Sequence, residues 1–135
     1  MTAPAFALQE AMRQALLAHG PLSALLGGPH IHDAPPRGVT APHVSFAEIE
    51  TRDWSDAGAM AHEHFVTLRV STNERGRGLA QAIAGEIEAV LDNANLALDG
   101  HKLVSLRLVF WTVGRERATE QIGATLRLRA ATEPQ

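Results

Sequence analysis

The chain has 135 residues, of which 45% are hydrophobic and 20% charged, and its formal net charge is −3. This size and composition predict a single globular domain over residues 1–135 that buries a hydrophobic core without metals or disulfides. The sequence contains no cysteine, which excludes thiolate chemistry. The mild negative charge argues against non-specific nucleic-acid binding, and no apolar run reaches the length of a membrane span.

The N-terminal third of the chain predicts helix followed by extended structure. Apolar residues recur at helical spacing from Pro4 to His19, and a Gly-Pro dipeptide ends that helix. A short helical turn from Leu22 to Leu26 comes next. A proline-rich segment follows, in which Ile31 begins a brief extended stretch. Alternating apolar residues then predict a strand from Pro42 to Glu50.

The middle of the chain predicts a loop, a strand and a helix. Residues 51–61 show no periodicity and contain turn-forming residues, so we expect a long loop of the kind that often binds partners. Clear alternation predicts a strand from His62 to Ser71, with Phe65 on its polar face. Helical spacing then predicts a helix from Leu79 to Leu91.

Two long strands are expected to close the chain. A brief extended piece, Leu96–Leu98, leads through a tight Asp-Gly turn into a strand from His101 to Val113. A charged connection over residues 114–119 joins it to a strand from Gln121 to Ala131. In the first of these strands, simple alternation places on one face Val104, Leu106, Leu108 and Phe110. It places on the other face Leu103, Ser105, Arg107, Val109 and Trp111.

The order helix, strand, strand, helix, strand, strand predicts an α+β fold. We expect a four-stranded antiparallel sheet with two helices packed on one face, because neighbouring strands are joined by turns and loops. The second face of this sheet is half apolar through Phe65, Val109 and Trp111. A half-apolar exposed face indicates a protein partner.

Two histidine pairs are the strongest candidates for chemistry. His30 and His32, like His62 and His64, are two residues apart, which places each pair on one face of a strand. Neither pair has a third ligand at the spacing of a zinc motif, so solvent-facing histidines are the preferred interpretation. A small metal-dependent hydrolase using these four residues remains a rival hypothesis, which stoichiometric zinc would favour.

Other catalytic motifs are missing from the sequence. It contains no Gly-x-Ser-x-Gly, no Ser-x-x-Lys and no P-loop, so we expect neither an enzyme nor a bound cofactor. Candidate interface residues instead lie in the two long connections, with Trp111 late in a strand as a further one, because Trp and Arg are enriched where partners dock. Trp111 is equally consistent with the core. The candidate set is Arg52, Asp53, Trp54, Asp56, Trp111, Arg115, Glu116 and Arg117.

Short segments in a fixed order carry a family resemblance. They are Leu-Ser-Ala-Leu-Leu-Gly-Gly at 22–28, Ile-His-Asp-Ala-Pro-Pro at 31–36, Ala-Pro-His-Val-Ser-Phe at 41–46, His-Glu-His-Phe-Val-Thr-Leu-Arg-Val at 62–70, Leu-Asp-Gly-His-Lys-Leu-Val at 98–104 and Ala-Thr-Leu-Arg-Leu-Arg-Ala-Ala-Thr-Glu at 124–133. Over nearly its full length, the chain resembles the tail-completion proteins of long-tailed phages and gene transfer agents, a family formerly known as a domain of unknown function.

The resemblance implies a structural subunit at the head-proximal end of a virion or gene transfer agent tail, made in the bacterial cytoplasm. Such proteins form a homohexameric ring on the tail tube protein, stop tube growth and dock the head-side connector. DNA passes through the lumen without sequence-specific binding, and no membrane is involved. A head-side connector or stopper of the same junction stays open as an alternative, as does a generic binding module or a partner of the toxin-antitoxin kind.

Overall fold

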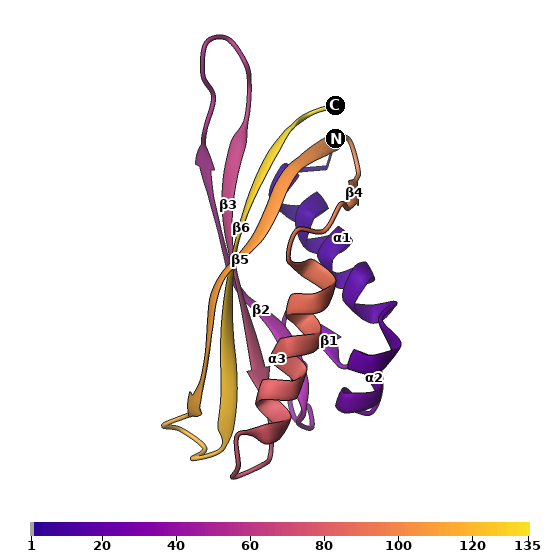
Figure 1. Ribbon diagram of the computed structural model, residues 1–135, viewed down its shortest axis with the longest axis vertical. Coiled ribbons are helices and arrows are strands. Elements are labelled where there is room, and N and C mark those ends of the chain that lie inside the picture. The colour runs from indigo at the N-terminus through magenta and orange to yellow at the C-terminus, as the bar shows by residue number, and fades with distance from the viewer. Residues whose placement is uncertain (1) are drawn as a thin grey trace.

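The computed structural model describes residues 2–135, which form three helices on one side of a curled six-stranded sheet (Figure 1). The strands lie in the order β1-β2-β3-β6-β5-β4. The helices are α1 (Pro4–Leu17), α2 (Gly20–Leu26) and α3 (Gly78–Leu91). The strands are β1 (Ile31–His32), β2 (His43–Asp53), β3 (His62–Ser71), β4 (Ala97–Leu98), β5 (His101–Arg115) and β6 (Ile122–Pro134).

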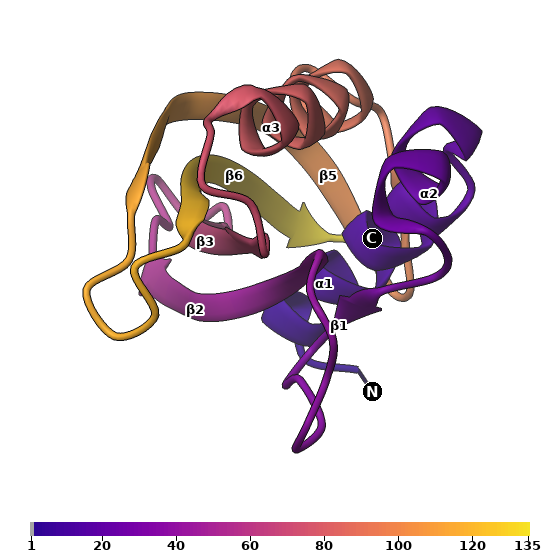
Figure 2. The same ribbon diagram turned by 90° about the horizontal axis from the view of Figure 1, so that it is seen from below.

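The predicted four-stranded antiparallel sheet with two helices is wrong. Two further strands, β1 and β4, flank the four long ones, and α2 is a third helix. The sheet is mixed, because β1 pairs in parallel with β2 while the other pairs are antiparallel. Viewed along the long axis, the sheet curls like half of a barrel (Figure 2). Strands of two residues carry no periodicity, so the sequence indicates extended backbone there without assigning it to a sheet.

The hydrophobic core lies between the helices and the inner face of the sheet. From the sheet, Leu68 and its neighbours Leu126 and Leu128 on β6 are fully buried. A buried side chain of this size contributes about 1.5–3 kcal/mol relative to its exposed state. Both long helices fill the concave side with the spacing that the sequence predicts, through Leu8, Met12 and Leu16 on α1 and Ile83, Ile87 and Leu91 on α3.

Two β-bulges in β5 overturn the faces predicted for that strand. The register with β6 shifts between Leu103 and Ser105 and again between Leu108 and Phe110. Each bulge inserts one extra residue, so the alternation of side chains reverses there. Phe110 is 49% exposed and pairs with Arg127 on the face turned away from the helices, here called the outer face. Leu103, in contrast, is buried in the core.

The two connections predicted as partner sites lie at opposite ends of the long axis (Figure 1). The predicted loop 51–61 is shorter than expected, because Thr51 and Asp53 still pair with β3. Its remaining residues, 54–61, form the tip of the β2–β3 hairpin at one end. The β5–β6 connection, residues 116–121, lies at the other end. No helix within residues 2–135 is long and apolar enough to cross a membrane.

Candidate interaction surfaces

The tip of the β2–β3 hairpin exposes large apolar side chains beside acidic ones. Trp54 is 49% exposed and Met60 is 63% exposed. Backbone hydrogen bonds order the loop, since the Trp54 N–H donates to the Ala61 carbonyl at 2.9 Å. Hydrogen bonds from Ser55 lower the pKa of the Asp53 carboxyl, which keeps that side chain negatively charged. This end of the molecule therefore presents apolar contact area with negative charge around it.

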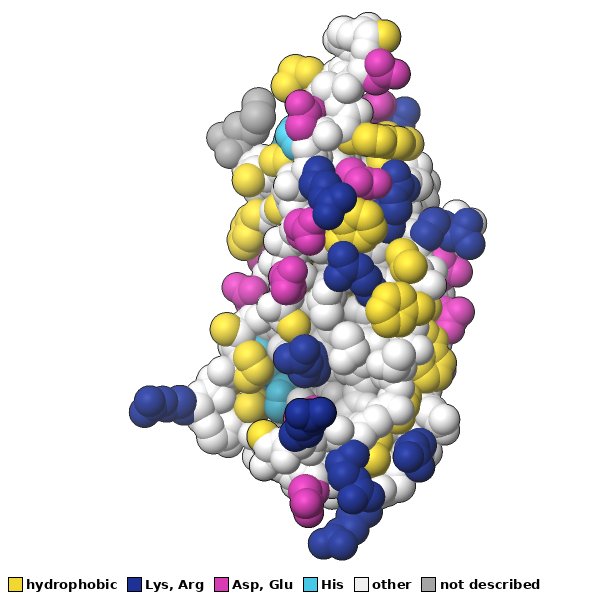
Figure 3. Space-filling model, turned by 90° about the vertical axis from the view of Figure 1, so that its left-hand side faces the viewer, with side chains coloured by type: hydrophobic (Ala, Val, Ile, Leu, Met, Phe, Trp, Pro, Cys, Tyr) yellow, Lys and Arg dark blue, Asp and Glu magenta, His cyan; other side chains and the backbone are white. Residues whose placement is uncertain are grey.

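The outer face of the sheet interleaves aromatic rings with guanidinium groups (Figure 3). The Phe65 ring lies between two of them, with the Arg127 guanidinium carbon 5.0 Å and that of Arg52 5.5 Å from its centroid. The Arg129 guanidinium lies 5.1 Å from the centroid of Trp54, and its Nε donates to Glu63 at 2.6 Å. Exposed cation–π pairs contribute about 0.5–1 kcal/mol each, so these contacts favour the observed arrangement of the side chains on this face.

The opposite end of the molecule is rich in arginine. The β5–β6 connection closes on itself, because the Glu116 N–H donates to the Gln121 carbonyl at 2.8 Å. Arg115 at the end of β5 and Arg75 in the turn before α3 line one polar hollow of about 170 Å³. The Glu116 carboxylate folds over Gly123, where an added Cβ would lie 2.5 Å from its Oε1. The predicted interface residues Arg115, Glu116 and Arg117 thus lie far from Arg52, Asp53, Trp54 and Asp56.

Trp111 lies apart from both groups. It packs against the core from the inner face of β5, and its indole Nε1 donates to Glu88 on α3 at 3.1 Å. Of the two roles left open for it by the sequence, this position favours the core. The bulge at Leu108/Phe110 explains the difference from its predicted face.

The four histidines of the rival metal-site hypothesis do not come together. The His62 and His64 rings stack on β3 with centroids 6.2 Å apart, and both ring nitrogens of His64 already hydrogen bond to threonine hydroxyls at 2.9 Å. The His32 ring lies instead 6.1 Å from His43, a residue that the sequence did not single out. Across residues 2–135, no group of three or more His, Cys, Asp or Glu side chains is arranged to hold a metal ion.

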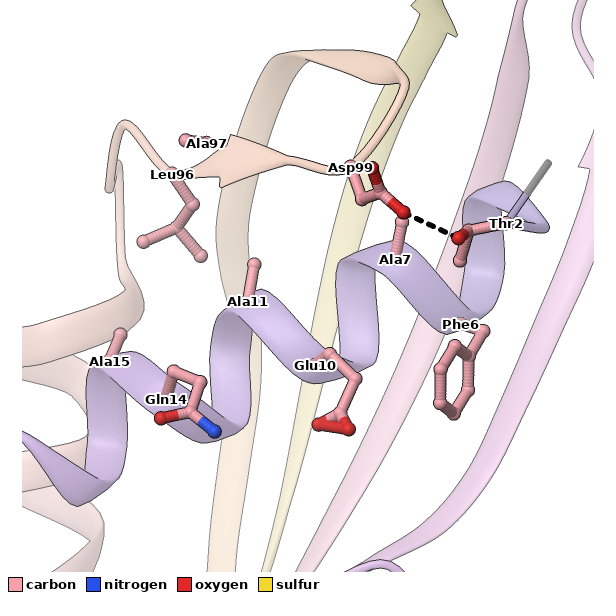
Figure 4. Close-up of a pocket in the computed structure, with 10 residues that line it drawn as sticks. All are labelled: Thr2, Phe6, Ala7, Glu10, Ala11, Gln14, Ala15, Leu96, Ala97 and Asp99. Carbon is pink, nitrogen blue, oxygen red and sulfur yellow. Dashed lines mark hydrogen bonds between the residues drawn. The ribbon is translucent and has the colours of Figure 1, made fainter.

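A groove along α1 is a surface that the sequence did not predict. It has a volume of about 560 Å³ and runs between α1 and the segment that contains β4 (Figure 4). Its walls come from parts of the chain some ninety residues apart, so no local sequence pattern predicts it. On the side of α1 it is lined by Thr2, Phe6, Ala7, Glu10, Ala11, Gln14 and Ala15, and across from them by Leu96, Ala97 and Asp99.

Comparison with known proteins decides the family. A sequence model described as tail completion protein gp17 matches residues 10–133. The chain belongs to this family. A chain in the virion of a native gene transfer agent (GTA) particle is similar at 30% identity, with a TM-score of 0.88 over 98% of this chain and 99% of that one. Among curated protein sequences, none matches.

A second solved structure shares the fold of this tail completion protein. The gp17 protein of bacteriophage SPP1 is 20% identical, with a TM-score of 0.63 over 93% of this chain and 88% of that one. The predicted resemblance to tail-completion proteins is therefore confirmed. The protein is a structural component of a phage-like tail, and its partners are other tail or head proteins.

Proposed function

We propose that this tail completion protein is a tail-terminator subunit. It forms a ring on the head-proximal end of the tail tube, stops tube growth and offers a docking surface to the head-side connector. The observation that carries the proposal is the family match over residues 10–133, supported by a near-complete structural likeness to a chain of a GTA virion. No catalytic residue enters this role, and we propose none.

The shape of the molecule suits a part that joins two different structures. One end carries exposed Trp54 and Met60 beside acidic residues, and the other carries Arg115 and Arg117. Ends of different chemistry select different partners, because complementary charge and buried aromatic anchors give specificity. We assign one end to the tail tube protein and the other to the head-side connector.

A six-fold homo-oligomeric ring is the assembly we propose for these subunits. Closed cyclic symmetry requires two different patches on each subunit, which meet head to tail. The outer face of the sheet and the helical side supply two surfaces of different character (Figure 1). DNA passes through the lumen without sequence-specific contact, and a subunit charge of −3 avoids strong retention of the phosphate backbone.

Growth of the tail tube in the presence of the purified protein tests the proposal. Tail tube protein from the same particle is polymerised with and without fluorescently labelled chain, and tube lengths are measured by electron microscopy. We expect shorter tubes, with the label at one end of each tube. Unchanged tube lengths with no label at the ends would contradict a terminator.

The same labelled protein distinguishes the connector alternative. Added to purified heads that lack tails, a head-side connector or stopper binds the heads directly and leaves tube growth unchanged. A terminator binds tubes first, and capped tubes then join heads. Direct binding to heads without any effect on tubes would assign the chain to the head side of the junction.

A further inference from the structure

The α1 groove is acidic and apolar. Its charged lining residues are Glu10 and Asp99, and no Lys or Arg lines it. Phe6 stands at one end and is 52% exposed, although a phenylalanine is usually buried. Within residues 2–135, one carboxylate oxygen of Glu10 is buried without a hydrogen-bond partner. The groove therefore leaves apolar surface uncovered and one carboxylate oxygen of Glu10 without a hydrogen-bond donor.

The outer face of β5 and β6 has the opposite character. The second bulge of β5 places Val109 and Phe110 next to each other on this face, where they are 54% and 49% exposed. Arg127 pairs with Phe110 across the strands and stacks on Phe65, and it makes no ion pair within the described chain. We call Val109, Phe110 and Arg127 the β5 ridge. It combines two half-exposed apolar side chains with a positive charge.

The groove and the ridge lie on different sides of the molecule. The groove is lined by α1 and the segment that contains β4, whereas the ridge residues lie on β5 and β6 and face away from the helices. Figures 1 and 2 show the helices on one side of the sheet only. They therefore cannot meet within one subunit. Two complementary patches on different sides are the arrangement that a head-to-tail ring requires.

We infer that the α1 groove of one subunit receives the β5 ridge of the neighbouring copy. Val109 and Phe110 fill the space above the alanines of α1, and Arg127 faces Glu10 and Asp99. A volume of about 560 Å³ has room for adjacent side chains of this size. This inference rests on the proposed ring and specifies the two surfaces that close it.

Cysteine cross-linking on assembled tube ends tests the assignment. The sequence has no cysteine, so introduced pairs react without background. We expect Ala11→Cys combined with Val109→Cys in one chain to give a ladder of dimers, trimers and larger species with a short bis-maleimide. A mixture of the two single variants should stop at dimers. The matched control pairs Ala11→Cys with Ala82→Cys, on the exposed side of α3, and should give no ladder.

The outcomes separate this inference from the proposed function. Rings at tube ends without a ladder from the Ala11/Val109 pair would overturn the assigned surfaces and leave the terminator intact. Dimers from Ala11→Cys alone would indicate a two-fold contact of the groove with itself and would also overturn the assignment. Absence of the chain from tube ends would contradict the proposed function, and the inference with it.

A charge exchange gives an independent readout. Glu10→Arg and Arg127→Glu should each reduce ring occupancy at tube ends at least about tenfold, since each places like charges across the contact. The double variant restores opposite charges and should recover to within about threefold of the unmodified chain. Phe110→Asp should weaken assembly while the half-exposed position leaves folding unchanged. A double variant that folds but assembles no better than the single variants would contradict the pairing.

Discussion

His64 illustrates how a residue that looks like a metal ligand serves the fold instead. Its ring is fully buried, and its two nitrogens bond to Thr51 on β2 and Thr132 on β6. The sequence places His64 beside His62 on one face, which is correct, but the threonines come from other strands. Spacing along one strand reveals a shared face and not what lies across the sheet.

Because His64 is buried, the stability of the fold depends on pH, and unfolding in acid measures this dependence. Desolvation, assisted by His62 and His101, lowers the pKa of His64 from 6.5 to about 4. The unfolded chain therefore binds this proton more readily than the folded one, so stability falls as the pH drops from about 6.5 towards 4. We expect this residue to account for a loss of about 2 kcal/mol between pH 7 and pH 4.5.

Urea unfolding of the chain and of His64→Gln at both pH values measures that loss. At pH 7 the His64→Gln variant should have a lower free energy of unfolding than the unmodified chain. On acidification, that free energy should fall distinctly less in the variant. His19→Gln is the matched control, since His19 bonds to Glu86 far from this cluster, and it should keep the full loss attributed to His64. An equal loss of stability in the chain and in His64→Gln would assign the acid sensitivity to other groups.

At the scale of elements, long periodic segments were predictable and short or irregular ones were not. The predicted helices Pro4–His19 and Leu79–Leu91 match α1 and α3 to within two residues at each end. The bulges of β5 have no such signal, because neither contains a glycine or a proline. They arise from the fit of β5 to β6, so Phe110 and Leu103 were assigned to the wrong faces. The α1 groove was missed for the same reason, since distant elements form it.

The bulge between Leu108 and Phe110 predicts that β5 tolerates the deletion of one residue. Val109 and Phe110 together oppose Arg127, so removal of Val109 restores regular alternation and leaves Trp111 facing the core. We expect the chain without Val109 to fold, with a free energy of unfolding lower by less than about 2 kcal/mol. Deletion of Thr125, where β6 pairs regularly on both sides, reverses the faces of its neighbours and should prevent folding. Thermal melts of both purified variants decide the matter. If the chain without Val109 failed to fold, the bulge itself would be required for folding.

At the scale of the whole molecule, the elongated sheet carries two ends of different chemistry. The strands β2, β3, β5 and β6 run between the hairpin tip and the arginine-rich end, so the two ends lie far apart (Figure 1). The sequence indicates the different composition of the two ends, through Trp54 in an acidic loop and Arg115 with Arg117 in a charged connection, and their role as partner sites stays a prediction. It gave no indication that they face in opposite directions, because this depends on the topology of the sheet.

This separation predicts that the two ends are required at different steps of assembly. Trp54→Ser with Met60→Ser removes the apolar area of the hairpin tip, and Arg115→Glu with Arg117→Glu reverses the charge of the other end. All four side chains are exposed, so both variants should melt within a few degrees of the unmodified chain. We expect one variant to fail at capping tail tubes, and the other to cap tubes normally but fail to join them to heads. Electron microscopy of complemented particles distinguishes overlong tubes from capped tails without heads. If both variants failed at the same step, the two ends would share one partner, and the second partner would have to bind the sides of the sheet.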